Sequence, residues 1–136
     1  MNNIRIEKLK YNVEKQGASC VYVMKKDSRQ IDDFFSFDQI LLDAPCSGSG
    51  ILNFNNKNLN KHFSLELIDK SAKIQLALLR KAIKVLKKNQ EMVYSTCSIL
   101  SKENEEIIIL LANTFKHIQL TIATNPNKGY FMCVPK

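Results

Sequence analysis

Two cysteines are placed where a thiol could act as a nucleophile. Cys46 lies in the stretch Asp43-Ala44-Pro45-Cys46-Ser47-Gly48, and Cys97 lies in Tyr94-Ser95-Thr96-Cys97-Ser98. Each follows an apolar run and is flanked by small or hydroxylated residues, so a thiol at either position would be accessible. The thiolate is the reactive form of cysteine, and it adds to electrophilic carbon. Asp43 could stabilise the charge that such an addition creates.

Methylation at C5 of a pyrimidine is a reaction that needs such a thiol. C5 is a weak nucleophile until a group adds to C6, and a thiolate can make that addition. C5 then takes a methyl group from a sulfonium donor, a base removes the C5 proton, and the thiol is eliminated. A buried cysteine is usually inert, so one cysteine alone would be weak evidence. Two cysteines at neighbouring strand ends favour the catalytic interpretation.

The remaining cysteines and histidines predict no further site. Cys20 and Cys133 fall inside predicted strands and are expected to be small core residues. His62 and His117 have no partner at a spacing that suggests catalysis. No CxxC pair and no metal-ligand spacing occur, so neither a zinc site nor a dithiol redox pair is predicted, and a reduced, intracellular protein fits best.

The charge balance favours a polyanionic partner. Twenty Lys and Arg against thirteen Asp and Glu leave a formal charge of +7 over 136 residues, as expected for a protein that binds nucleic acid. A lysine-rich solvated surface explains the charge equally well. No stretch is apolar enough to span a bilayer and the start lacks a secretory signal, so we expect no membrane partner and a location in the nucleus, nucleolus, cytoplasm or an organelle.

Helical and strand patterns alternate along the chain. Apolar residues recur at helical spacing in three segments: 3–16, 64–88 and 101–115. Short β-branched and aromatic runs predict five strands: 19–25, 37–44, 91–99, 118–124 and 129–134. The asparagine-rich stretch 53–63 is predicted to be a loop. This alternation is typical of a mostly parallel α/β sheet, and the turn between the last two strands adds an antiparallel hairpin.

Two elements carry more specific predictions. The near-continuous apolar run of 37–44 predicts a strand that is buried on both faces of the sheet. In the third helix, Ser101 is the predicted N-cap. Glu103, Glu105 and Glu106 are then predicted to place negative charge in the first turn, where it favours the helix dipole.

Three candidate groups follow predicted strands. They are Asp27, the loop 43–50 and the pair Thr96-Cys97. In open α/β sheets, ligands bind beyond the carboxyl ends of the strands. The sequence therefore predicts one active site at that edge of the sheet.

The segments DAPCSGSG and YSTCSI, with ENE a few residues on, resemble the NOL1/NOP2/Sun family of RNA cytosine-5 methyltransferases. The resemblance covers nearly the whole chain and includes Asn12, Asp27, Gln75 and the terminal GYF. It implies a Rossmann-like class I methyltransferase fold. It also implies S-adenosylmethionine as the methyl donor and ribosomal or transfer RNA as the substrate.

The resemblance also assigns roles to single residues. In that family the cysteine of the TC motif, here Cys97, attacks C6, and the cysteine of the PC motif, here Cys46, assists release of the methylated product. Asp27 would contact the adenine of the donor, Asp43 would lie between donor and base, and Pro45 would shape the loop.

The resemblance further predicts that residues 1–136 form a single, partial methyltransferase domain. The family's donor site begins with a strand, a glycine-rich loop and a second strand that ends in an acid. None of the four glycines here lies in a strand-GxG-helix context. We therefore expect this chain alone to be inactive and to bind the donor weakly or not at all. An unpaired strand edge would favour self-association.

Two other functions compete with an enzyme. A non-catalytic RNA-binding scaffold of methyltransferase fold, acting in ribosome assembly, would explain the fold and the charge. The presence of Cys46, Cys97 and Asp43 argues against it. A phosphate-binding loop at PCSGSG would need the lysine that such loops use, and it has none.

Overall fold

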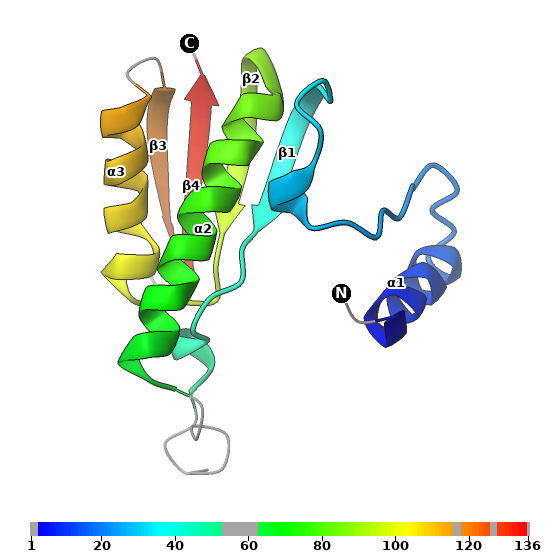
Figure 1. Ribbon diagram of the computed structural model, residues 1–136, viewed down its shortest axis with the longest axis horizontal. Coiled ribbons are helices and arrows are strands. Elements are labelled where there is room, and N and C mark those ends of the chain that lie inside the picture. Colours follow the sequence, from blue (N-terminus) through cyan, green and yellow to red (C-terminus); the bar gives the residue numbers. More distant parts are fainter. Residues whose placement is uncertain (1–2, 53–62, 116–117, 126–127, 136) are drawn as a thin grey trace. The chain divides into compact units, whose positions relative to one another are not determined.

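The computed structural model describes residues 3–52, 63–115, 118–125 and 128–135. Beyond residue 115 the description covers the backbone alone. The chain divides into two units, residues 1–32 and 33–136, and each is described by itself (Figure 1). The predicted loop 53–63, apart from Phe63, lies outside the described residues, and so do His62 and His117.

The first unit contains helix α1, Asn3–Lys15, as predicted. Gly17 follows in a left-handed conformation, with φ 67°, where glycine pays no steric penalty. The predicted strand 19–25 is wrong, because these residues form neither helix nor strand, and Cys20 is exposed rather than in a core. A strand exists only through hydrogen bonds to a neighbour, and no other strand is present among the described residues of this unit.

The second unit contains a four-stranded sheet in the order β1-β2-β4-β3 (Figure 1). The strands are β1, Phe37–Asp43; β2, Leu86–Ser95; β3, Ile118–Asn125; and β4, Lys128–Pro135. β1 pairs in parallel with β2, while β4 pairs antiparallel with both β2 and β3. β1, β2 and β3 therefore run in one direction, and β3 and β4 form the predicted hairpin.

β1 is confirmed as a strand, but its predicted burial on both faces is wrong. Its only neighbour in the described sheet is β2, so β1 is an edge strand. Ile40 and Leu42 pack against the core, whereas Leu41, on the opposite face, is 74% exposed.

The boundary between α2 and β2 differs from the prediction. Helix α2, Leu65–Val85, begins after Ser64, whose hydroxyl accepts a hydrogen bond from the N–H of Leu67, and it ends three residues earlier than predicted. β2 begins at once at Leu86, which pairs with Phe37. Asn89 has φ 60° and the register shifts nearby, so an irregular entry lies where helix was expected.

The end of β2 and the start of α3 also differ from the prediction. β2 ends at Ser95, four residues before the predicted end, so Cys97 lies in a loop. Ser101 opens a short 3-10 helix, Ser101–Glu103, and α3, Glu105–Thr114, begins after Asn104. Glu105 and Glu106 occupy the first turn of α3 as predicted, but Glu103 does not, because it lies in the preceding 3-10 helix, where its side chain is fully buried.

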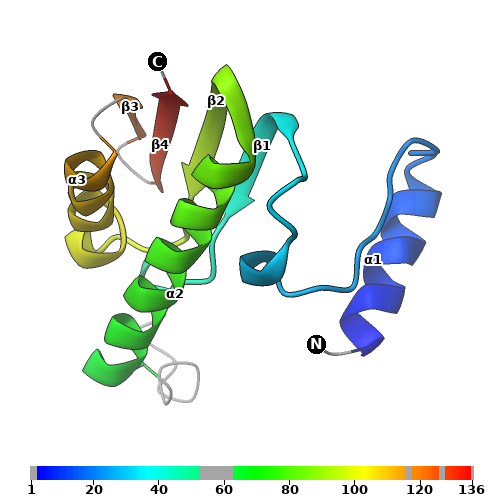
Figure 2. The ribbon, with the colours of Figure 1, turned by 45° about the horizontal axis from the view of Figure 1, so that its top comes forward.

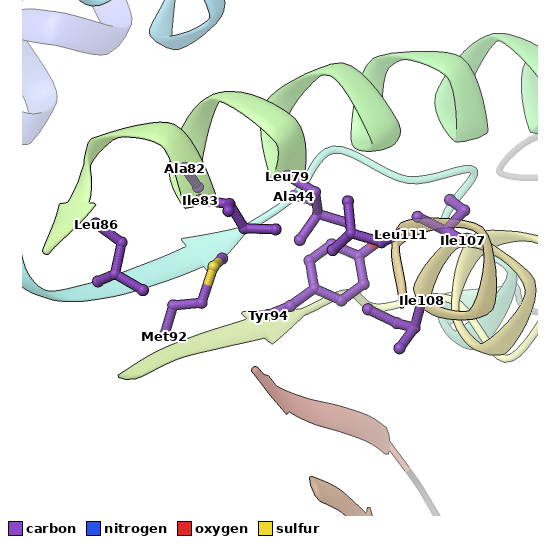
Figure 3. Close-up of a cluster of buried hydrophobic side chains, with 10 residues drawn as sticks. All are labelled: Ala44, Leu79, Ala82, Ile83, Leu86, Met92, Tyr94, Ile107, Ile108 and Leu111. Carbon is purple, nitrogen blue, oxygen red and sulfur yellow. The ribbon is translucent and has the colours of Figure 1, made fainter. Parts of the chain in front are cut away.

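Helix α2 covers one face of β1 and β2, and α3 packs against α2 next to β3 (Figure 2). Met92 and Tyr94 are two residues apart in β2, so their side chains lie on the same face of the sheet. Both point into a cluster beneath the two helices (Figure 3). The ten buried members of this cluster are Ala44, Leu79, Ala82, Ile83, Leu86, Met92, Tyr94, Ile107, Ile108 and Leu111. Burial of each large side chain stabilises the fold by about 1.5–3 kcal/mol. The cluster therefore anchors the carboxyl ends of β1 and β2.

Among the described residues, no helix is long and apolar enough to cross a membrane.

Candidate active site

The loops that follow β1 and β2 leave the sheet side by side. The N–H of Ala44 donates to the carbonyl oxygen of Ser95 at 2.9 Å, and the N–H of Gly50 donates to that of Cys97 at 3.0 Å. Because β1 and β2 are parallel neighbours, their carboxyl ends meet at one edge, and these backbone bonds extend the contact beyond the strands.

Gly50 permits the close approach of the two loops. A Cβ atom at this position would lie 2.5 Å from the carbonyl oxygen of Cys97 and 3.4 Å from the side chain of Ile99. The first distance is far inside van der Waals contact, and the obstacle is backbone. Gly48 meets a different requirement, since its φ of 75° is left-handed. The two glycines of the predicted motif thus serve the loop geometry.

The structure brings Cys46 and Cys97 together. Their Sγ atoms lie 2.8 Å apart, and both cysteines are free thiols. Cys97 is exposed and Cys46 is partly buried. Burial, followed by the hydrogen bond with Cys97, raises the pKa of the Cys46 thiol from 9.0 to about 11. Cys46 therefore retains its proton at neutral pH.

Asp43 and Pro45 flank the thiols. Asp43 is exposed at the end of β1, and its Oδ1 accepts a hydrogen bond from the hydroxyl of Ser95 at 3.2 Å. The carbonyl oxygen of Pro45 accepts a hydrogen bond from Nε2 of Gln75 at 2.9 Å, which ties the loop to α2. Four of the predicted site residues thus lie together: Asp43 at the end of β1, and Pro45, Cys46 and Cys97 on the two adjoining loops.

Asp27 lies in the first unit, after a segment that is not a strand. Its carboxylate accepts hydrogen bonds from the backbone N–H, Nε and Nη2 of Arg29. The Arg29 guanidinium lowers the pKa of Asp27 from 3.8 to about 2. Asp27 is therefore a charged carboxylate whose acceptor sites are already engaged by a neighbour.

The sequence did not reveal the importance of Glu103. Its carboxylate is fully buried and accepts hydrogen bonds from Ser47, Ser98 and Gln75. Its backbone oxygen accepts the hydroxyl hydrogen bond of Tyr94 at 2.8 Å. The signal available was the ENE segment, in which the first Glu is buried and only the second lies on α3.

Asn104 holds the loop that contains Cys97. Its side-chain oxygen accepts a hydrogen bond from the Thr96 hydroxyl at 2.7 Å, and its amide donates to the carbonyl oxygens of Ser98 and Leu100 at 2.9 and 3.0 Å. Each polar atom of this buried side chain thus has a partner in the loop, so the loop is specified in detail.

The basic residues of α2 are partly neutralised by acids. Lys81 lies 2.5 Å from Asp33, and Lys84 pairs with the same carboxylate. Exposed pairs of this kind contribute little to stability, but they reduce the charge offered to a polyanion. Among the described residues, no group of three His, Cys, Asp or Glu side chains could hold a metal ion.

The site combines an exposed thiol, a second thiol that retains its proton, and a carboxylate at the same sheet edge. A planar electrophile above Cys97 could receive the sulfur, while the proton of Cys46 and the charge of Asp43 lie nearby. This arrangement suits covalent catalysis on a ring carbon.

Solved structures share this fold. A structure titled "Crystal Structure of PH0851" matches with TM-score 0.84 and 26% identity, covering 97% of this chain and 34% of that one. NSun6 from Pyrococcus horikoshii matches with TM-score 0.78 and 25% identity, covering 97% and 38%. The chain therefore has the Rossmann-like fold of class I methyltransferases.

The family is identified from sequence. Residues 1–131 match the family model described as 16S rRNA methyltransferase RsmB/F, and the chain belongs to this family. Ribosomal RNA small subunit methyltransferase F of Shewanella loihica is 35% identical over 113 residues, which are 82% of this chain and 23% of the relative. The enzyme of the same name in Psychromonas ingrahamii is 34% identical over 118 residues, or 85% and 24%. The chain spans about a quarter of the length of these relatives.

Proposed function

We propose that the whole protein is an RNA cytosine-5 methyltransferase that uses S-adenosylmethionine and acts on ribosomal RNA. The observation that carries the proposal is the 2.8 Å approach of Cys46 and Cys97 at the carboxyl ends of parallel strands. Membership of the RsmB/F family supports the substrate class.

In the proposed reaction Cys97 is the nucleophile, because it is the exposed member of the pair. Its thiolate forms a bond to C6 of the cytosine, and the C5–C6 π electrons move so that C5 becomes nucleophilic. S-adenosylmethionine, when bound, supplies the methyl group to C5 as a sulfonium donor. Water accepts the C5 proton, the electrons of that C–H bond restore the C5–C6 double bond, and the C6–S bond breaks to release the Cys97 thiolate.

Cys46 suits the release step rather than the attack. Its pKa of about 11 keeps it protonated at neutral pH, so it is a poor nucleophile and a possible proton carrier beside the leaving thiolate. Asp43 would stabilise charge on the ring between donor and base.

The donor assignments rest on Asp43, Pro45 and Asp27. Asp43 fits, since its carboxylate is exposed at the end of β1. Pro45 fits as a shaping residue, since its carbonyl oxygen is tied to Gln75. Asp27 fits only if its carboxylate can bind the donor and Arg29 at the same time, or if its hydrogen bonds with Arg29 break when the donor binds. NSun6 from Pyrococcus horikoshii, which matches this chain, was solved with SFG, an S-adenosylmethionine analogue.

The proposed compartment is the cytoplasm. The two ribosomal RNA methyltransferases compared above come from bacteria, which have no nucleus. The formal charge of +7 suits an RNA partner through phosphate contacts.

Covalent trapping tests the proposal. The whole protein is incubated with RNA and donor, and the RNA adduct is resolved on a denaturing gel. Cys46→Ala is expected to accumulate the adduct, because release is impaired. Cys97→Ala is expected to form none and to lose methylation by about a thousandfold or more. Cys20→Ala, which removes an exposed thiol of the first unit, is the matched control. An adduct that depended on Cys46 instead would reverse the roles.

A further inference from the structure

Glu103 lies behind the thiol pair and contacts both loops. We propose that Glu103 is a positioning residue that sets the separation of Cys46 and Cys97. It does so by binding the residue that follows each cysteine. The catalytic meaning of that separation rests on the proposed function, whereas the separation itself can be measured without it.

The contacts of the carboxylate are divided between the loops. Oε1 accepts hydrogen bonds from the Ser47 N–H at 2.7 Å and from Gln75 Nε2 at 3.4 Å. Oε2 accepts the hydroxyl hydrogen bonds of Ser47 at 2.5 Å and of Ser98 at 2.6 Å. Ser47 follows Cys46 and Ser98 follows Cys97, so one carboxylate joins the chain immediately after each thiol.

The hydroxyl groups in this network have a single consistent direction. Ser98 donates its hydrogen to Glu103, so the 2.8 Å bond between the Ser49 and Ser98 hydroxyls must have Ser49 as donor. Ser49 then accepts from the N–H of Ile99 at 2.9 Å, and Ser98 also accepts from the N–H of Leu100 at 3.1 Å. The carboxylate is the final acceptor of this chain of donors.

Gln75 shows that this buried polar network has a cost in folding stability. Its amide nitrogen points at Pro45 and Glu103, and its buried Oε1 has no hydrogen-bond partner among the described residues. An unpaired buried acceptor is unfavourable, and a buried carboxylate carries a desolvation cost even when both of its oxygens are hydrogen-bonded. An apolar side chain could fill the space without either cost. The polar network is therefore suited to a specific placement of the loops rather than to stability alone.

An acceptor at both oxygens is what the network requires. In Glu103→Gln the amide oxygen can replace Oε1, but the NH₂ group at Oε2 would point at Ser98, which already accepts two hydrogen bonds. The hydroxyl chain would have to reverse, leaving Ser49, which is buried, with a hydrogen that has no acceptor among the described residues. We expect the loops to shift while the fold persists.

The test is binding of phenylarsine oxide to the whole protein. Its trivalent arsenic forms bonds to two thiols with loss of one water, and the second bond forms readily only when the thiols are held close together. Protection of Cys46 and Cys97 from alkylation is followed by mass spectrometry of their peptides, with Cys20 as the single-thiol reference. Glu105→Gln, an equal charge change at an exposed position two residues on, is the matched control.

We expect Glu103→Gln to require about tenfold more arsenical for half protection, and Glu105→Gln to match the wild type, since loss of preorganisation weakens binding. A stabilising role alone would lower the unfolding temperature and leave protection of the folded protein unchanged. In the enzyme assay, kcat should fall while KM for RNA is retained.

Wild-type protection in folded Glu103→Gln would overturn the proposal. If Glu103→Gln does not fold, Ser98→Ala takes its place, and wild-type protection in that variant would overturn the proposal equally. Weakened protection in Glu103→Gln, together with an absence of any RNA adduct in Cys46→Ala, would leave the positioning role in place and refute the proposed function.

Discussion

The two thiol loops, residues 44–50 and 96–100, contrast with residues 18–27, which carry Asp27. Asp27 and both thiol loops were predicted to follow strands at one sheet edge. The thiol loops follow real strands and are joined by buried hydrogen bonds, such as those of Glu103 and Asn104. Residues 18–27 contain no strand, and Val21, Tyr22 and Met24 are exposed. The geometry of the part proposed to perform covalent chemistry is thus specified within the described residues, while the proposed role of Asp27 in donor binding rests on resemblance.

Gly50→Ala has the largest expected effect on the packing of the thiol loops. Its Cβ would meet the carbonyl oxygen of Cys97, so the loops must separate. We expect a loss of about 1–3 kcal/mol in the free energy of unfolding, as for other overpacked sites, and methylation at background level.

Gly17→Ala is the comparison for Gly50→Ala. Gly17 has φ 67° and nothing within 4 Å of an added Cβ, so only the left-handed conformation should cost stability, by about 1 kcal/mol. Urea unfolding measures both variants. An equal, small effect at the two positions would contradict close packing of the thiol loops.

The proton on Cys46 offers a second distinction within the thiol pair. Because its pKa is raised to about 11, alkylation of Cys46 should reach half its maximal rate near that pH. In Cys97→Ala the midpoint should fall but stay above 9.0, since burial is the larger cause of the raised pKa and the hydrogen bond with Cys97 the smaller. Peptide mass spectrometry over a pH series gives both midpoints. A midpoint in Cys97→Ala at or below 9.0 would contradict this order of causes, and a midpoint that rises would contradict any contribution of Cys97 to the shift.

The raised pKa of Cys46 also makes the free energy of unfolding depend on pH. The folded state holds the Cys46 proton more tightly than the unfolded state, so this contribution to stability is complete below pH 9.0 and is lost as the pH rises through about 11. The urea concentrations at which the wild type and Cys46→Ala are half unfolded should therefore converge between pH 9.0 and about 11.

Donor binding tests the region around Asp27 and has the smallest expected effect. The 136-residue chain should bind S-adenosylmethionine more weakly than micromolar, because none of its glycines lies in the strand-GxG-helix context of a donor site and Arg29 occupies the Asp27 carboxylate. Arg29→Ala releases that carboxylate and should change the heat of donor binding only slightly. Calorimetry measures both, and a micromolar affinity of the chain would contradict the expectation.

Much of the fold could be predicted from sequence, for local reasons. The periodicity of α1 and of α2, with its Ser64 cap, is a property of short stretches, and so is the hairpin of β3 and β4. The motifs around Cys46 and Cys97 also pointed to neighbouring strand ends, because parallel strands end at a common edge.

The remaining features depended on which segments meet. Residues 19–25 have strand composition, but a strand needs a partner, and β1 is apolar but lies at an edge. Glu103 looked like a helix-dipole residue, and only the approach of Ser47 from 56 residues away gave it a buried role. The types of the reacting groups are determined by the sequence itself. Their separation, exposure and proton affinity are decided by tertiary structure, because each depends on atoms that distant segments bring together.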